Sequence, residues 1–251
     1  MKVIQFLKKI SKAEIKKYQK FVSEIDPEIR LKKTFSQHGH EYLISILLGN
    51  VTSGYFVEFG AIDGITNSNT YYFEKFLGWN GILAEPAKKW HKKLLSNRTA
   101  HIETDCVFTE SNLELEFVET GKWKGGNTLI KHLNSDNKKR IISDRYSVKT
   151  ISLNDLLDKF KAPKHIEFIS IDTEGSELEI IKSFNFSNYS FSIICIEHNG
   201  LEDKRESLRK IFEDHHYHRL TLPDSLTNVD DWYVSRKISD SFASRLDSLN
   251  L

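Results

Sequence analysis

Glycine and acidic residues gather at one point of the chain, in the segment YFVEFGAIDGITNSNTYYFEK at residues 55–75. Glu58 ends an apolar run, Gly60 and Gly64 follow it, and Asp63 lies between the two glycines. Glycine lets a backbone approach a ligand closely, and a carboxylate at the end of a strand attracts a cation. The segment lacks the middle glycine of GxGxxG and has no GK[ST], so neither a nicotinamide site nor a Walker phosphate cradle is supported. It predicts a loop for a cationic ligand without a pyrophosphate.

Two more acids follow along the chain. Glu85 ends the next apolar run, 21 residues after Gly64 (85 minus 64), and an acid about 20 residues beyond a glycine loop binds ribose hydroxyls in many such sites. Asp105 ends the following run beside Cys106, where it would meet an adenine amino group. A ligand that is cationic, carries ribose and lacks phosphate matches S-adenosylmethionine. The alternative is that these acids cap helices or lie on the surface.

Short apolar runs alternate with helix-like segments from residue 55 onward, a pattern typical of a parallel sheet covered by helices on both faces. Ligands bind such sheets outside the carboxyl ends of the strands, where these acids would meet. Ser152 stands three residues before Asp155, as in a capping box, and indicates a helix start. Helices are predicted at residues 71–77, 87–95, 152–160, 176–184 and 204–214. Strands are predicted at residues 55–60, 81–86, 101–108, 166–172, 191–198, 218–222 and 231–237.

The predicted organisation is one principal domain at residues 51–251, preceded by an N-terminal helical extension at residues 1–50. Apolar residues recur in the first part of this extension at helical spacing. An insertion at about residues 109–150 interrupts the sheet pattern, and LELEFVET within it alternates as an exposed strand would. We expect the insertion to lie over the edge or the mouth of the sheet.

Charge and cysteine content limit the partners. Lys and Arg number 36 against 35 Asp and Glu, so no overall positive field suggests nucleic acid or an anionic membrane. The apolar stretches near the N-terminus are too short for a signal peptide core or a membrane span. Cys106 and Cys195 lie inside apolar runs, as buried free thiols do. We expect a cytoplasmic protein, and the amphipathic N-terminal segment leaves a homodimer open.

Four segments in order, VEFGAIDGITNSNTYYFEK, GILAEP, TISLNDLL and IEFISIDTEGSELEIIKSF, resemble the FkbM family of S-adenosylmethionine-dependent methyltransferases. The resemblance covers about residues 34–200 and includes SQHGHEYLI upstream. It implies a class I methyltransferase fold, with a seven-stranded, mostly parallel Rossmann-like sheet, helices on both faces and the last strand antiparallel. It also implies methyl transfer to a hydroxyl, commonly on sugars or natural products. Asn69 joins the predicted cofactor contacts, and many relatives carry Asn where this chain has Asp63.

The segments SIDTEGSE and CIEHNG mark the ends of the fourth and fifth strands, where an acceptor hydroxyl would lose its proton. His198 is the preferred base because imidazole titrates near neutral pH. Asp172 would hold the methionine amino group or the acceptor hydroxyl, and Glu174 would orient His198; helix capping is the alternative for both acids. Asp172, Glu197 and His198, with Asn199, could instead hold Mg²⁺, although a metal-free base is favoured.

Basic and aromatic residues of the insertion suit a sugar ring that carries phosphates, because indole covers an apolar sugar face and cations meet the negative charge. The predicted acceptor is a nucleotide-activated sugar or a surface-polysaccharide precursor. The alternatives are a non-sugar metabolite, or a non-catalytic binding module that retains the fold. The predicted acceptor contacts are Trp123, Lys124, Asn127, Lys131 and Asn199, on a surface that also carries His132, Lys138, Lys139 and Arg140.

Overall fold

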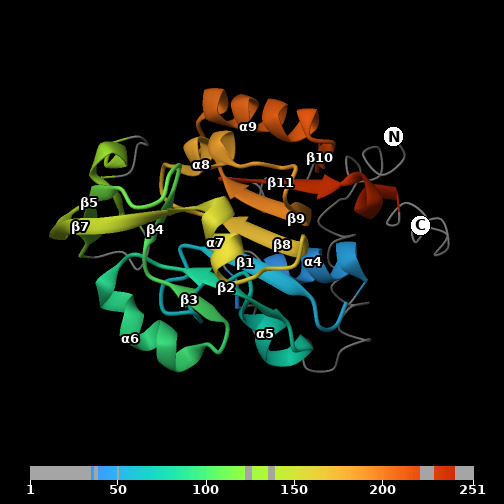
Figure 1. Cartoon of the computed structure of the whole chain (residues 1–251), viewed down its shortest axis with the longest axis horizontal. Helices are drawn as coiled ribbons and strands as arrows, with labels where there is room; N and C mark the ends of the chain where they lie inside the picture. The colour runs from blue at the N-terminus through green and yellow to red at the C-terminus, as the bar shows by residue number, and fades with distance from the viewer. Residues whose placement is uncertain are drawn as a thin grey trace.

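A computed structural model of the chain describes residues 35–36, 39–49, 51–121, 126–134, 139–220 and 229–240 (Figure 1). Residues 1–34, on which most of the predicted N-terminal extension falls, lie outside the described residues. The α-helices in the described part of the chain include α4 (His40–Leu48), α5 (Tyr71–Leu77), α6 (Lys88–Asn97), α7 (Leu153–Lys159), α8 (Glu177–Ser183) and α9 (Glu202–Asp214). None of the helices described has the length and apolar character needed to cross a membrane.

The strands form two sheets. The main sheet contains β1 (Tyr55–Phe59), β2 (Asn80–Ala84), β3 (His101–Glu103), β8 (His165–Ile171), β9 (Ser190–Glu197), β10 (Tyr217–Arg219) and β11 (Asp230–Ser235). The second sheet contains β4 (Cys106–Phe108), β5 (Glu114–Thr120), β6 (Thr128–Leu129) and β7 (Ile142–Ser152), with a short 3-10 helix at Ile130–His132.

The main sheet has the strand order β10-β11-β9-β8-β1-β2-β3. The five strands from β3 to β9 run parallel, β11 runs antiparallel to β9, and β10 runs antiparallel to β11. The chain therefore forms β1, β2 and β3 in order toward one edge of the sheet, and then returns to form β8 on the other side of β1. The chain order reverses between the neighbouring strands β1 and β8, and their carboxyl ends form the switch point at which such sheets bind ligands. The predicted seven-stranded, mostly parallel sheet is confirmed.

Alternate side chains of the strands pack against helices on opposite faces, as the two-residue period of a strand requires. Val57 and Phe59 join a core cluster with residues of α7, α8 and α9, whereas Phe56 joins a second cluster with α4, α5 and α6. Figure 1 shows α8 and α9 above the sheet and α5 and α6 below it. Glu58 has the parity of Phe56, so its carboxylate lies on the α5 and α6 side.

The single strand predicted at residues 101–108 is wrong. The Glu103 Oε1 atom accepts hydrogen bonds from the backbone N–H groups of Thr104 (2.9 Å) and Asp105 (3.0 Å), which ends β3. The next three residues form β4, which pairs with β7 in the second sheet instead of β2. Because the Glu103 side chain accepts these backbone N–H groups, the apolar run at residues 101–108 is divided between the two sheets.

The predicted insertion folds as most of the second sheet, in the order β4-β7-β5-β6. β5 is not the exposed strand that its alternation predicts, because Phe117, Val118, Glu119 and Thr120 are all buried. Phe117 belongs to a third core cluster with Cys106, Phe108 and residues of β6 and β7. The second half of β5 is therefore covered on both faces. Cys106 and Cys195 are buried and free, as predicted.

The helix start predicted at Ser152 is confirmed. Ser152 is the N-cap of α7, and its side-chain oxygen accepts a hydrogen bond from the backbone N–H of Asp155 at 3.1 Å. Ser152 also ends β7, so the cap sets the direction in which the chain leaves the second sheet and returns to the main sheet at β8.

Candidate functional site

A cleft with roughly 600 Å³ of empty space lies where β1, β2 and β8 end. The second sheet forms one of its walls through Phe117, Asn127 and Leu129. Six of the predicted site residues line it: Gly60, Glu85, Cys106, Asn127, Asp172 and Glu174. Nine other predicted site residues that the structure describes are not among its lining residues: Glu58, Asp63, Gly64, Asn69, Asp105, Lys131, Glu197, His198 and Asn199.

Gly60 brings the ends of β1 and β8 into direct contact. Its φ is +74°, a conformation that residues with a Cβ rarely adopt, and an added Cβ would lie 2.4 Å from the backbone oxygen of Asp172. Only glycine allows this approach. The glycine after β1 therefore fixes where Asp172 stands relative to the loop that follows Gly60.

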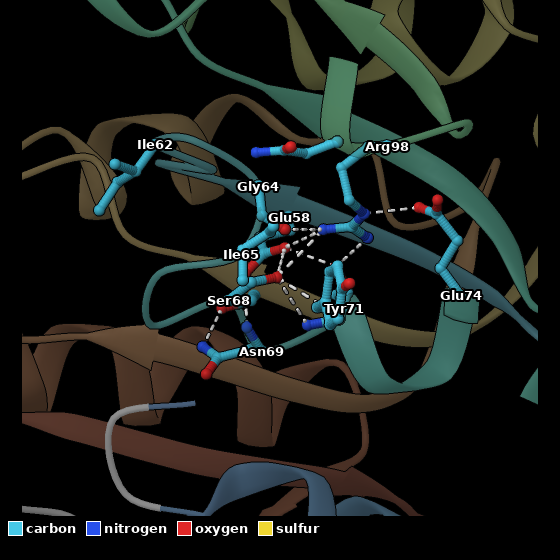
Figure 2. A network of polar contacts seen from close by, with 12 residues as sticks. Glu58, Ile62, Gly64, Ile65, Ser68, Asn69, Tyr71, Glu74 and Arg98 are labelled. Atoms are coloured by element: carbon cyan, nitrogen blue, oxygen red, sulfur yellow. Dashed lines mark hydrogen bonds and ion pairs between the residues drawn. The ribbon is translucent and has the colours of Figure 1, made fainter. Parts of the chain in front are cut away.

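Glu58 lies beneath that loop in a buried network of polar contacts (Figure 2). Its carboxylate accepts hydrogen bonds from the Ser68 hydroxyl (2.9 Å), the Asn69 backbone N–H (2.7 Å) and the Thr70 hydroxyl (2.5 Å). Glu58 thus holds the far end of the loop, and its role as a cofactor contact stays a prediction. Gly64 packs on the same network, because an added Cβ would lie 2.6 Å from the Arg98 Cγ.

Asp63 and Asn69 also organise the loop. The Asp63 carboxylate accepts hydrogen bonds from the backbone N–H of Thr66 (2.7 Å) and from its hydroxyl (2.9 Å), the geometry of a turn. The Asn69 amide donates to the Ser170 hydroxyl at 2.9 Å, and its oxygen lies 2.9 Å from the His40 Nδ1. Asn69 thereby joins the loop to β8 and to α4.

Glu85 lies at the β2 end of the cleft and is buried. Its two carboxylate oxygens accept hydrogen bonds from the backbone N–H groups of Ile62 and Ala87, each at 2.8 Å. Burial outweighs these hydrogen bonds and raises the pKa of Glu85 to about 7. Burial likewise raises the pKa of the neighbouring Cys106 thiol to about 12, so this thiol is neutral. Asp105 lies between β3 and β4, outside the cleft lining.

The loop after β8 is clamped to the second sheet. Glu174 has φ +58°, and its carboxylate lies 2.8 Å from the Arg140 Nη2 atom. The Thr128 hydroxyl donates to the Glu174 backbone oxygen at 2.9 Å. Arg140 also donates to the backbone oxygens of Gly126 and Leu133, each at 3.1 Å, and its side chain is 3% exposed. The predicted placement of Arg140 on a binding surface is therefore wrong, because it is the core of this clamp.

The tips of β8 and β9 carry several acids. Asp172 is exposed to the cleft, and side-chain oxygens of Asp172, Glu177 and Glu197 all lie within 4.8 Å of one another. Desolvation by the surrounding protein, together with the charges of Glu197 and Glu174, raises the pKa of Asp172 well above its usual range. A carboxyl group at the mouth of this cleft can therefore hold or release a proton nearer to neutral pH.

Comparison with known families decides the assignment. Residues 58–227 match the family model described as the methyltransferase FkbM domain, which is more than half of the chain. This chain belongs to the FkbM methyltransferase family. No curated protein matches it.

Solved structures similar to this FkbM family member share little sequence with it. The methyltransferase FkbM from Methylobacillus flagellatus KT is 11% identical with a TM-score of 0.47, over 92% of this chain and 58% of that chain. The O-methyltransferase from Bacillus cereus in complex with SAH is 11% identical with a TM-score of 0.41, over 94% and 98% of the two chains. The precorrin-6y C5,15-methyltransferase from Geobacter metallireducens GS-15 is 14% identical with a TM-score of 0.39, over 73% of each chain. The family member thus spans 58% of the length of the Methylobacillus structure.

In this FkbM family member, the loop after β9 is tied to α8 and not to the cleft. His198 is buried, and its Nδ1 accepts a hydrogen bond from the Gly200 backbone N–H at 3.1 Å. The Lys204 ammonium lies 2.8 Å from the Asn199 oxygen and 2.5 Å from the Glu177 carboxylate. Glu177, and not His198, joins Asp172 and Glu197 in one of the two groups with metal-ligand spacing among the described residues. The Lys204 ammonium already neutralises part of this group.

The predicted acceptor surface is only partly described. Trp123, Lys124 and Lys138 lie outside the described residues, and Lys139 is exposed. Lys131 Nζ lies 2.8 Å and His132 Nε2 lies 3.0 Å from the same Glu179 carboxylate oxygen. The positive charge of Lys131 is thus paired with an acid of α8. The Asn127 oxygen accepts hydrogen bonds from Lys89 Nζ (2.9 Å) and from the Thr120 backbone N–H (3.0 Å) at the wall of the cleft.

Sequence reasoning missed the apolar wall of the cleft and the residue beneath its loop. Phe117 and Leu129 line the cleft from the second sheet, although LELEFVET indicated an exposed strand. Phe117 and Val118 are adjacent and both apolar, which was the available signal for a strand covered on both faces. Arg98 follows α6 with no motif around it, so no local signal marked it.

Proposed function

We propose that this protein transfers a methyl group from S-adenosylmethionine to a hydroxyl of a sugar, in a nucleotide-activated sugar or a surface-polysaccharide precursor. The observation that carries the proposal is the charge of the cleft at the switch point of the sheet. Glu85, Asp172 and Glu174 line it, whereas none of the described residues that line it is Lys or Arg. Acidic groups after β2 and β8, with no Lys or Arg among these lining residues, favour a cationic ligand over a phosphate-bearing one.

The residues present fit this cofactor on two counts. Gly60 lines the cleft without a side chain, and the close contact with the Asp172 backbone that this allows brings the ends of β1 and β8 together where a ligand would lie. Each Glu85 oxygen accepts one backbone N–H, and a carboxylate oxygen has two lone-pair directions. Glu85 therefore retains acceptor capacity for the hydroxyl groups of a ribose.

When bound, the cofactor supplies a methyl group on a positively charged sulfur. The protein must position the acceptor hydroxyl and take its proton. Asp172 is the residue we assign to this step, because it lines the cleft and its raised pKa makes its carboxylate a stronger base than usual. The proton would move from the acceptor hydroxyl to an Asp172 carboxylate oxygen. His198 stays a predicted base, but it lies outside the cleft lining.

Support for a hydroxyl of a sugar comes from the family resemblance and from the basic residues of the insertion. Among the described ones, Lys131 and Arg140 each pair with a glutamate, which leaves less free positive charge than the sequence indicated. A sugar hydroxyl needs no such charge for recognition, whereas the phosphates of a nucleotide-activated sugar do. The two forms of the acceptor are therefore separable by experiment.

Calorimetric titration with S-adenosylhomocysteine tests the cofactor site in wild type and in Glu85→Ala, with and without EDTA. We expect saturable binding that EDTA leaves unchanged and that Glu85→Ala weakens about tenfold, the loss of one or two hydrogen bonds to a charged group. The absence of binding to the wild type would overturn the proposal. A loss of binding in EDTA alone would instead assign a metal to the acid group at β8 and β9.

Methyl transfer then tests the acceptor. Incubation with labelled S-adenosylmethionine and matched pairs of nucleotide-activated and free sugars should give alkali-stable label on the sugar, as a methyl ether does. Label on both members of a pair identifies the hydroxyl as the recognised group, and label on the activated form alone assigns a role to its phosphates. Asp172→Asn should retain S-adenosylhomocysteine binding and lose transfer at least 100-fold if it accepts the proton.

A further inference from the structure

Arg98 lies outside the lining of the cleft, yet its guanidinium contacts several parts of the loop that forms it (Figure 2). Its side chain is fully buried beside α5, and Nε donates to Glu74 at 2.7 Å. Nη1 donates to the Gly64 backbone oxygen (3.0 Å) and to the Ser68 hydroxyl (3.1 Å), and Nη2 donates to the Thr70 hydroxyl (2.9 Å). One side chain thus contacts three points of the loop and one point of the helix after it.

The two hydroxyls bridge Arg98 to Glu58. Ser68 and Thr70 each accept a hydrogen bond from the guanidinium and donate one to the Glu58 carboxylate. Their hydroxyl hydrogens are therefore oriented toward Glu58 and their lone pairs toward Arg98. Arg98 Nη1 itself lies 3.8 Å from the Glu58 oxygen, so the charges attract across the hydroxyls. The loop has little freedom at this end, because both hydroxyls are held by Arg98 and by Glu58 at once.

We propose that Arg98 is a positioning residue for the cofactor, which sets cofactor affinity by holding residues 60–70 in the binding conformation. The inference rests on the proposed function. Gly60 fixes the beginning of the loop against Asp172, and Arg98 fixes its middle and end. A loop that is ordered before the ligand arrives loses less conformational entropy on binding, so its ligand binds more tightly. The Glu58 and Glu74 carboxylates lie beside the buried guanidinium and compensate it, as a buried charge requires.

Arg98→Lys tests this role, because a lysine keeps the charge but cannot reproduce a planar fork that meets four acceptors. The control is Arg205→Lys, which shortens another arginine that meets a buried acid: Arg205 donates to Asp231 at 3.0 Å, between α9 and β11. Neither residue lines the cleft. We expect the dissociation constant of S-adenosylhomocysteine to rise about tenfold in Arg98→Lys and to stay within twofold in Arg205→Lys. Both are measured at a temperature where each variant is folded.

Hydrogen exchange separates positioning from general destabilisation. In Arg98→Lys without ligand, amides of residues 60–70 should lose protection while those of β9 keep it, and saturating S-adenosylhomocysteine should restore the protection. Ser68→Ala is the milder variant, which removes one bridge and should raise the dissociation constant about threefold. Ser68→Ala replaces Arg98→Lys as the test variant if Arg98→Lys does not fold.

The outcomes distinguish this inference from the proposed function. Absence of binding to the wild type would overturn both. Wild-type binding together with unchanged affinity and unchanged loop protection in Arg98→Lys, or in Ser68→Ala where the former does not fold, would overturn the positioning role alone. Equal losses of affinity in Arg98→Lys and Arg205→Lys would also overturn it, because a general loss of stability would then explain the effect.

Discussion

Near the glycine loop, Glu58 and Glu74 accept hydrogen bonds from hydroxyls, backbone N–H groups and Arg98. At the ends of β8 and β9, by contrast, several acids lie close together around one lysine. We call the first the loop region (residues 58–74 with Arg98). We call the second the acid region (Asp172, Glu177, Glu197 and Lys204). Both regions border one cleft, on either side of the contact between Gly60 and Asp172.

The difference shows what each half of the cleft can do. Carboxylates that are engaged by several donors stay ionised and hold geometry, which suits a loop that must keep one shape. Carboxylates that face one another raise the pKa of at least one member, which suits a proton transfer. The partners of the acids thus distinguish a region suited to holding a cofactor from a region suited to taking a proton from an acceptor hydroxyl.

Gly60→Ala should have the largest effect, because it separates the two regions. A Cβ at this φ costs about 1–2 kcal/mol, and its clash with the Asp172 backbone adds about 1–3 kcal/mol, since backbone moves little. We expect a loss of about 4 kcal/mol in the free energy of unfolding and no measurable S-adenosylhomocysteine binding. Urea unfolding and calorimetry measure the two.

Gly200→Ala is the matched control for that variant. Gly200 has φ +71°, close to the +74° of Gly60, but an added Cβ meets nothing within 4 Å. It should lower the free energy of unfolding by only about 1 kcal/mol and leave the affinity unchanged. Similar losses in both variants would show that the backbone conformation matters and the contact with Asp172 does not.

Lys204→Met should have the next largest effect and acts in the acid region. Burial opposes ionisation of Glu177, but the Lys204 ammonium and the Gly175 backbone N–H outweigh burial and hold the pKa of Glu177 below its usual range. The stabilisation from this pair is therefore present above about pH 4.5 and is lost as the pH falls through the folded pKa. Removal of the lysine leaves a buried charge, at a cost of about 3 kcal/mol at pH 7.

The pH profile and a double variant check this account. The deficit of Lys204→Met should shrink as the pH falls and Glu177 takes up a proton, measured by urea unfolding from pH 5 to 8. Glu177→Leu combined with Lys204→Met removes both charges and should recover most of the lost stability. A deficit that is independent of pH would indicate that packing of the lysine stem, and not its charge, is what Lys204 contributes.

The sequence predicted the elements of the main sheet because their signals are local. Alternating or continuous apolar runs marked β1, β8 and β9, and the cap at Ser152 marked α7. The second sheet was not predicted, since its strands pair across the insertion and its buried acid Glu119 has an uncharged partner, Tyr146, far along the chain. No local pattern shows such a partner.

The candidate site was predicted in position more fully than in role. Of the acids predicted at strand ends, Glu85 and Asp172 line one cleft together with Gly60, whereas Glu58 and Asp105 are not among its lining residues. Sequence spacing does not show which hydrogen bonds an acid makes, so it did not indicate that the Glu58 oxygens accept hydrogen bonds from the loop; the cofactor contact of Glu58 stays a prediction. The buried cation that accounts for the position of the Glu58 carboxylate is Arg98, which is 40 residues away in the sequence (98 minus 58).

Glu85 borders the loop region but has the raised pKa expected of the acid region. It should therefore show a pH dependence of its own, with a smaller effect than the substitutions above. The pKa of Glu85 rises to about 7 through burial, against an ordinary value of 4.5. The folded protein therefore binds more protons than the unfolded chain between these values, and the free energy of unfolding should fall as the pH rises from 4.5 to 7. Glu85→Gln should remove this part of the pH dependence.

Cofactor affinity should change in the opposite direction. A ribose hydroxyl donates more strongly to an ionised carboxylate than to a neutral carboxyl, so S-adenosylhomocysteine should bind about fivefold more tightly at pH 8 than at pH 6. Glu85→Gln should bind more weakly and with a flat profile, measured by calorimetry in buffers of matched ionic strength. A wild-type profile that is equally flat would mean that Glu85 is already ionised at pH 6, or that it does not contact the ribose. The free energy of unfolding separates the two explanations. If it is independent of pH in the wild type and has the same value in Glu85→Gln, Glu85 is already ionised at pH 6 and belongs with the acids of the loop region.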